Sequence, residues 1–261
     1  MAYYDQYNND NSQVVYDFSN KQTKGAFLTK VFGMMFLCLL ITTVVAAGFG
    51  YGFQALLINT ATADGVLDSN VVTTLSITLI VSIIALLVMS FVLPITFMRG
   101  RHNIIVPLMI YVALMGILLS TFTFIMDWVI LVEAFGITTI IFGVMGLLGY
   151  VSKGRLAGIG VILIGLLMGA GLLSLMNWLM ILIGGIQESN ITISWIVSLM
   201  IFAFLMFVTL YDVYRIRRIA ENGAAQNNNL VYYCAFILYS DFISILIRVI
   251  YFLASISNRR N

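Results

Sequence analysis

Seven long apolar segments, separated by short polar ones, dominate this sequence of 261 residues. Hydrophobic residues make up 61% of the chain and charged residues only 9%, whereas soluble domains contain about 25% charged residues. A helix needs about 20 apolar residues to cross a membrane, and each segment is longer. The sequence therefore predicts an all-α polytopic membrane protein with seven transmembrane helices. The predicted spans are Phe27–Ile58, Val71–Met98, Ile104–Met126, Trp128–Val151, Leu156–Ile186, Ile193–Ile219 and Leu230–Ser255.

The charges in the loops predict how these spans are oriented. Basic residues follow the second, fourth and sixth spans, and the alternate loops contain acidic residues but no Lys or Arg. Because positively charged loops stay in the cytosol, the N-terminus is predicted to be cytosolic. Arg259 and Arg260 break the pattern, since they would lie outside if the last span crosses fully. A re-entrant last segment would return them to the cytosol, and this alternative stays open.

Outside the spans the chain is short and polar. Residues 1–26 are rich in Asn, Gln and Tyr and contain no apolar run that would form a signal-peptide core, so we expect a disordered cytosolic tail. Residues 27–256 are expected to form the transmembrane domain and residues 257–261 a short C-terminal tail. The short chain and the bare tail favour a bacterial plasma membrane. The net charge of +2 is too small to indicate a nucleic-acid partner.

Two aspartates lie inside predicted spans, where an ionised carboxylate costs several kcal/mol. Asp241 lies near the middle of the last span, and Asp212 lies near the end of the sixth span within LYDVYRI. An ionisable residue inside a membrane indicates function by default. The midpoint of the two positions falls between Gln226 and Asn227, inside the polar linker between the spans. In an antiparallel hairpin the two carboxylates should therefore lie level with each other.

Two carboxylates held close in a low dielectric resist double ionisation and share one proton. The pair is thus predicted to act as a pH-dependent latch. Protonation would tie the two helices together, and repulsion at higher pH would loosen them or attract a cation. Calcium prefers about six to eight oxygen ligands, so a calcium site formed by Asp212 and Asp241 should be weak, hydrated and transient, as suits permeation. No tightly bound cofactor is expected.

Polar residues near the pair have structural as well as functional interpretations. Arg248 lies two helical turns after Asp241 on the same face, so it is a candidate counter-ion. Tyr211 precedes Asp212 and is a candidate for a residue that supports the aspartate pair from behind it. Arg215 lies three residues after Asp212, and an ordinary ion pair at the cytosolic edge of the membrane is the structural alternative for these two residues.

Other polar or small residues in the spans have simpler explanations. Glu133 is a candidate pore acid, but its place close to the predicted outer edge favours a solvated carboxylate. Cys38 and Cys234 lie in apolar segments without the spacing of metal ligands, as expected of small buried side chains. One run of glycines recurs at every third residue and predicts a closely packed helix face. These glycines are Gly143, Gly146 and Gly149.

An intramembrane aspartyl protease is the enzymatic alternative, because it too needs two aspartates on neighbouring membrane helices. The Tyr211-Asp212 sequence fits that class. However, the second acid of such proteases follows Gly-x-Gly, whereas Asp241 follows LYS. The chain also offers no nucleotide-binding loop, and its single histidine leaves no histidine metal cluster. We therefore expect no enzymatic activity.

The run AFILYSDFISILIRVIYFL resembles the last-helix signature of the Bax inhibitor (transmembrane Bax inhibitor motif) family, and LYDVYRI resembles the end of that family's sixth helix. Two further stretches are similar to its third helix and to its fourth and fifth helices, namely YVALMGILLS and EAFGITTIIFGVMGLLGYVSKGRLAGIG. The resemblance covers Phe27 to Leu253. It implies a seven-helix fold whose last helix is surrounded by the other six, and a pH-sensitive calcium leak governed by an aspartate pair, here Asp212 and Asp241.

The sequence departs from the family pattern in one respect. Family members with a described gate pair the aspartates with an arginine of the second helix, but Val71–Met98 contains no basic residue. Arg248 or Arg99 would have to substitute, or the gate differs. The resemblance further implies a membrane-anchored protease as the partner of bacterial relatives and suppression of cell death by eukaryotic ones. A non-transporting regulator of another membrane protein is therefore the alternative function.

Overall fold

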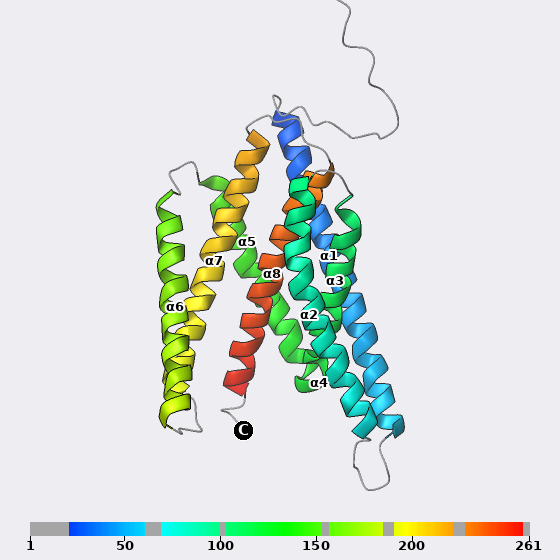
Figure 1. Cartoon of the computed structure of the whole chain (residues 1–261). Helices are drawn as coiled ribbons and strands as arrows, with labels where there is room; N and C mark the ends of the chain where they lie inside the picture. The colour runs from blue at the N-terminus through cyan, green and yellow to red at the C-terminus, as the bar shows by residue number, and fades with distance from the viewer. Residues whose placement is uncertain are drawn as a thin grey trace, which may run out of the picture.

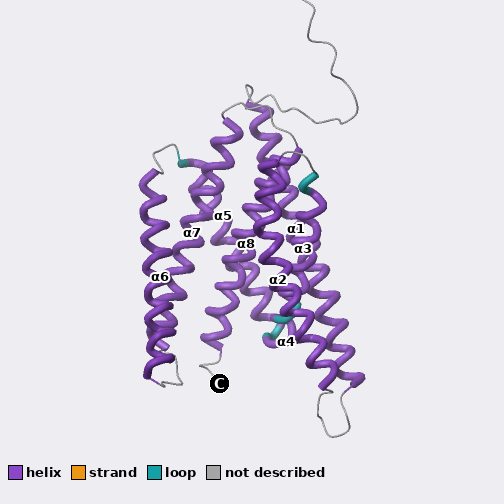
Figure 2. Tube along the Cα trace, viewed as in Figure 1, coloured by secondary structure: helices purple, strands orange, loops and turns teal. Residues whose placement is uncertain are grey.

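The computed structural model describes residues 21–60, 69–99, 103–152, 157–184, 191–221 and 228–257. Within these ranges all regular structure is helical (Figure 2). Figure 1 shows the long helices running side by side as a bundle. The helices are α1 (Lys21–Thr60), α2 (Ser69–Arg99), α3 (Ile105–Leu119), α4 (Phe122–Ile125), α5 (Trp128–Val151), α6 (Ala157–Gly184), α7 (Ile191–Glu221) and α8 (Asn228–Ser257).

The seven long helices lie where the apolar segments predict them, which confirms the all-α fold class. Among the described residues, five helices are long and apolar enough to cross a membrane, and α3 and the Ile162–Leu175 part of α6 are shorter apolar helices. Helix α1 begins at Lys21, within the segment expected to be a tail, because Lys, Gln and Ala continue a helix readily beyond an apolar run. The rest of that expected tail, residues 1–20, lies outside the described residues.

The third apolar segment, expected as one span over Ile104–Met126, is instead broken into α3 and α4. The hydroxyls of Ser120 and Thr121 donate to the carbonyls of Ile117 and Leu118, three residues back in the chain. Side-chain hydroxyls that compete for backbone groups in this way weaken a regular helix. Hydropathy alone does not reveal such a break, because three Ser and Thr residues leave the segment apolar on average.

The last helix, α8, occupies the centre of the bundle, as the resemblance implies. It packs against α1, α2, α3, α5 and α7, and it passes through the middle of the view in Figure 1. Of the membrane window of α8, 56% is buried, compared with 17–28% for the other four long spans. The expected ring of six helices needs one correction: α6 packs mainly against α7, at the outer flank of the bundle.

Helix α8 is continuous from Asn228 to Ser257. At 1.5 Å per residue its 30 residues extend about 45 Å, more than a bilayer core of about 30 Å requires. The structure therefore favours a full crossing by the last segment over the re-entrant alternative. Arg259 and Arg260, which motivated that alternative, lie outside the described residues.

Candidate functional site

The strongest candidate site surrounds Asp241, which lies in the most buried helix of the bundle. Its residue exposure is only 9%. Within the described part of the chain, its Oδ2 atom is buried and has no hydrogen-bond partner. Native proteins rarely leave a buried carboxylate oxygen without a partner, so each case requires an explanation. Asp241 is therefore the most unusual polar group in the described core.

The turn of α8 that contains Asp241 contacts several helices, because successive side chains of a helix point about 100° apart. The Tyr239 hydroxyl lies 2.6 Å from Thr42 Oγ1 of α1, and both side chains are buried. The next residue, Ser240, is hydrogen-bonded to Tyr111 of α3. The same Tyr111 side chain also reaches Ser90 of α2. A chain of hydroxyls thus joins α8 to the three N-terminal helices.

The next two residues of this turn face the C-terminal half of the bundle. Asp241 interacts electrostatically with Asp212 of α7. Phe242 is held between Phe135 and Phe142 of α5, with both ring centroids 5.5 Å from its own. Asp241 is thus fixed in position by neighbours on both sides in the chain, and the charged group that acts on its carboxylate is the second acid.

Asp212 is half-buried on α7 and has a mixed environment. The exposed guanidinium of Arg215, three residues later, acts on the Asp212 carboxylate. Both groups also act on the buried Cys234, which lies two turns before Asp241 on α8. The Asp212 carboxylate therefore interacts with a cation at the helix surface and with the buried carboxylate of Asp241.

The other predicted site residues lie apart from this pair. Arg248 is half-buried, and the charged group that acts on Asp241 is Asp212 rather than this arginine. Tyr211 is half-buried beside Asp212. Glu133 is exposed near the start of α5, while the end of α5, at Gly149, is the part that approaches Leu210 of α7. The structure thus brings together Asp212, Asp241 and Arg215, and it does not bring Glu133 to them.

Two hydroxyl features were missed in the sequence. The first is the set of hydroxyl contacts described above, which involves Thr42, Tyr239, Tyr111 and Ser240. The second is Thr138 of α5, which is fully buried and whose Oγ1, like Asp241 Oδ2, has no partner in the described structure. Thr138 lies between Phe135 and Phe142 on the face of α5 that holds Phe242. The sequence signal that could have indicated these features is the presence of hydroxyl residues at helical spacing within the apolar spans.

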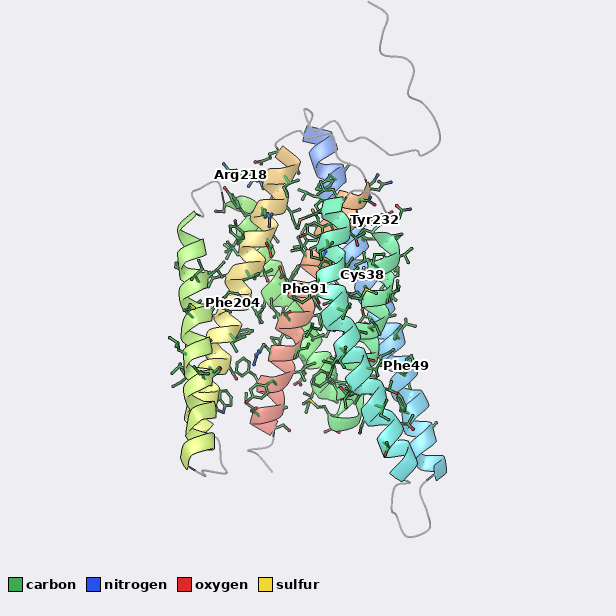
Figure 3. All side chains as sticks on the ribbon, in the orientation of Figure 1. Cys38, Phe49, Phe91, Phe204, Arg218 and Tyr232 are labelled. Atoms are coloured by element: carbon green, nitrogen blue, oxygen red, sulfur yellow. The ribbon has the colours of Figure 1, made fainter. Side chains whose placement is uncertain are left out.

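The described residues contain no group of three or more His, Cys, Asp or Glu side chains that would hold a metal ion. Two carboxylates without further protein ligands would leave most of the coordination shell of a calcium ion to water. The two cysteines, Cys38 and Cys234, are both free and buried, as expected; Figure 3 shows Cys38 within the bundle.

Residues 24–259 match the sequence profile of the family described as inhibitor of apoptosis-promoting Bax1. The chain belongs to this family. The match spans every helix that carries the site, including the LYDVYRI and AFILYSDFISILIRVIYFL segments on which the resemblance was based. No curated protein matches the chain. As a Bax inhibitor family member with long apolar helices, this chain is an integral membrane protein.

Proposed function

We propose that this Bax inhibitor family member is a pH-sensitive calcium leak in a bacterial plasma membrane, gated by protonation of the Asp212 and Asp241 pair. Calcium is the transported ion, and no cofactor is tightly bound. The observation that carries the proposal is the buried Asp241 carboxylate, with one unpartnered oxygen and a second acid as its charged neighbour. An ordinary structural aspartate in a membrane would be paired with a cation or with backbone donors.

The latch follows from the different surroundings of the two acids. Asp241 is buried on α8, which packs against five other helices, while Asp212 is half-buried on α7, three residues before the exposed Arg215. With one proton shared between the acids, α7 and α8 are held together by a hydrogen bond. When that proton leaves, two negative charges face each other in a low dielectric and repel. The repulsion separates the helices and makes the pair attractive to a hydrated cation.

The structure supports a gate that does not depend on an arginine of the second helix. Arg215 acts on Asp212 from the same helix, whereas the charged group that acts on Asp241 among the described residues is Asp212 itself. Because Asp241 is the more deeply buried of the two acids, the proposed latch places the shared proton mainly on Asp241. Calcium flux should accordingly be low when the pair is protonated and should rise as the pH rises.

The direct test is calcium entry into liposomes that contain the purified protein, measured across a pH series. Asp241→Asn should abolish the pH response and hold flux near its low-pH level, because an amide imitates the protonated acid and still donates a hydrogen bond. Asp212→Asn should remove most of the response. Glu133→Gln is the matched control, because it removes one acid from an exposed position of α5 away from the pair. Wild-type pH dependence in both aspartate variants would refute the latch.

A second candidate is a non-transporting regulator that binds another membrane protein, such as a membrane-anchored protease. The family description as an inhibitor favours this function, because an inhibitor acts on a partner. It predicts no calcium flux at any pH, and it predicts that Asp212→Asn and Asp241→Asn change partner binding or stability instead. The same liposomes therefore distinguish the two functions.

A further inference from the structure

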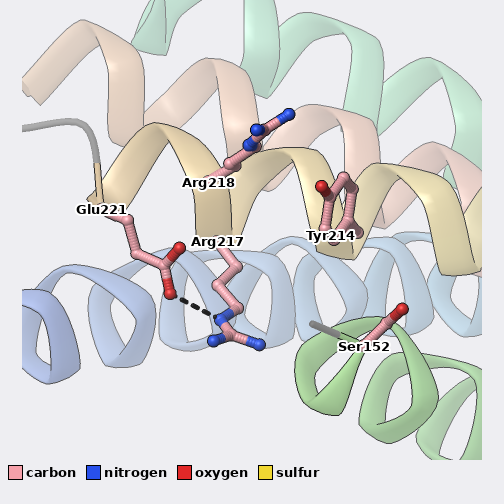
Figure 4. Close-up of a pocket in the computed structure, with 5 residues that line it drawn as sticks. All are labelled: Ser152, Tyr214, Arg217, Arg218 and Glu221. Atoms are coloured by element: carbon pink, nitrogen blue, oxygen red, sulfur yellow. Dashed lines mark hydrogen bonds and ion pairs between the residues drawn. The ribbon is translucent and has the colours of Figure 1, made fainter. Parts of the chain in front are cut away.

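A pocket of about 240 Å³ lies at the end of the bundle where α5 and α7 finish. It is lined by Ser152, Tyr214, Arg217, Arg218 and Glu221 (Figure 4). Ser152 follows the last residue of α5, and the other four residues occupy the last turns of α7. The pocket thus lies beyond the aspartate pair, on the side of the membrane that the loop charges predict to be cytosolic.

One of the two arginines in the pocket is fully engaged by the protein. Arg217 Nε donates to Glu221 Oε1 at 2.8 Å, and Arg217 Nη1 donates to the backbone carbonyl of Tyr150. Its guanidinium carbon also lies 5.1 Å from the centre of the Tyr150 ring. These contacts join the end of α5 to α7. They also balance the only carboxylate of the pocket, so that Glu221 does not repel an anion.

The second arginine retains its charge. Arg218 is exposed, and its guanidinium carbon lies 5.8 Å from the centre of the Tyr214 ring. Among the residues that the structure describes, Glu221 pairs with Arg217, and Arg218 has no carboxylate partner. The stacked ring orients the guanidinium, and Ser152 and Tyr214 add two hydroxyls to the same pocket. A planar guanidinium without a carboxylate partner matches the geometry of a phosphate group.

The surroundings of the pocket indicate where such a phosphate comes from. Leu147, Leu148 and Val151 precede Ser152 on the last turns of α5, and all three side chains are exposed. In a membrane, these apolar surfaces face acyl chains just below the pocket. Basic pockets between membrane helices at this depth bind anionic lipid headgroups.

We propose that this pocket binds the headgroup phosphate of an anionic phospholipid of the cytosolic leaflet, with Arg218 as its principal cation. Arg217 holds α5 and α7 at the spacing that forms the pocket. The acyl chains of the lipid lie along the exposed face of α5. This site is separate from the aspartate pair and does not depend on calcium transport.

The test measures lipid binding to the purified protein in detergent. Native mass spectrometry detects and quantifies the bound lipid. Phosphatidylglycerol and phosphatidylcholine with identical acyl chains are the two probes. Arg218→Gln should weaken phosphatidylglycerol binding about fivefold, as expected for loss of one interfacial arginine, and leave phosphatidylcholine binding unchanged. Arg218→Lys should also weaken it, because an ammonium does not form the paired hydrogen bonds of a guanidinium.

Arg101→Gln is the matched control, since it removes one arginine from another loop on the same predicted side of the membrane. Equal losses in Arg218→Gln and Arg101→Gln, or full binding by Arg218→Lys, would show diffuse surface charge and overturn the site. Soluble glycerophosphoglycerol should compete only at much higher concentration than the lipid. Equal competition by this soluble headgroup would identify a site for free phosphate esters and overturn the lipid assignment.

Discussion

Gly149 allows α5 to approach α7 closely, and its replacement gives a prediction with a built-in control. A Cβ atom at this position would lie 2.5 Å from the carbonyl oxygen of Leu210 and 3.1 Å from Val213 Cβ. The first obstacle is backbone, so α7 as a whole must move to make room. Gly146, one turn earlier on the same helix, has nothing within 4 Å of its corresponding position.

The expected energies follow from two opposing effects. Replacing a helical glycine with alanine gains about 1 kcal/mol of helix propensity at either position. Overpacking a close contact costs about 1 to 3 kcal/mol, and this cost applies only at Gly149. Gly146→Ala should therefore stabilise the protein by up to about 1 kcal/mol, while Gly149→Ala should be neutral or destabilise it by up to about 2 kcal/mol.

Reversible unfolding in mixed micelles titrated with dodecyl sulfate measures this difference directly. The two variants should differ in the free energy of unfolding by about 1 to 3 kcal/mol, with Gly149→Ala the less stable. Because Asp212 lies two residues after Leu210 on α7, Gly149→Ala should also change the pH response of calcium flux, whereas Gly146→Ala should not. Two variants of equal stability would refute the close approach of α5 and α7.

Two further predictions concern buried hydroxyls and use the same unfolding measurement. Tyr239→Phe should lower the free energy of unfolding by about 1 kcal/mol, because Thr42 keeps its 2.9 Å hydrogen bond to the carbonyl of Cys38. Thr42→Val should lower it by about 2 kcal/mol, because the Tyr239 hydroxyl is then buried without that partner. Equal costs would contradict this asymmetry. Thr138→Val should stabilise the protein by about 1 kcal/mol, since it replaces an unpartnered buried hydroxyl with a methyl group of similar shape. A loss of stability there would show that the hydroxyl has a partner.

The sequence was sufficient to predict the long helices, apart from the break between α3 and α4, and the register of the last hairpin. Apolar length alone marks a membrane span, because the thickness of the bilayer fixes the number of residues. Mirror symmetry about the predicted midpoint between Gln226 and Asn227 places Phe252 level with Ile201, and in the structure its ring contacts Trp195 and Phe202. The same symmetry predicted that Asp212 and Asp241 would be neighbours.

Partners across the bundle were harder to predict, because periodicity identifies a helix face but not what covers it. Of the glycines that recur at every third residue, Gly149 meets another helix, while Gly143 and Gly146 have nothing within 4 Å of an added Cβ. The prediction of close packing along this run of glycines is therefore correct at Gly149 only. Likewise, no spacing rule indicated that Tyr239 and Thr42, 197 residues apart, would share a hydrogen bond.

The neighbours of the Asp241 turn indicate which helix moves when the proposed latch opens. Tyr239 fixes this turn to α1, and Phe242 fixes it to α5 between two aromatic rings. Displacing α8 would break both contacts at once. Helix α7 carries the half-buried Asp212 and packs against α6 on its outer side, but it also packs against α5. Repulsion between the two carboxylates should therefore move α7, together with α6, away from a stationary α8, and this movement must also shift the contacts of Gly149 and Arg217 between α5 and α7.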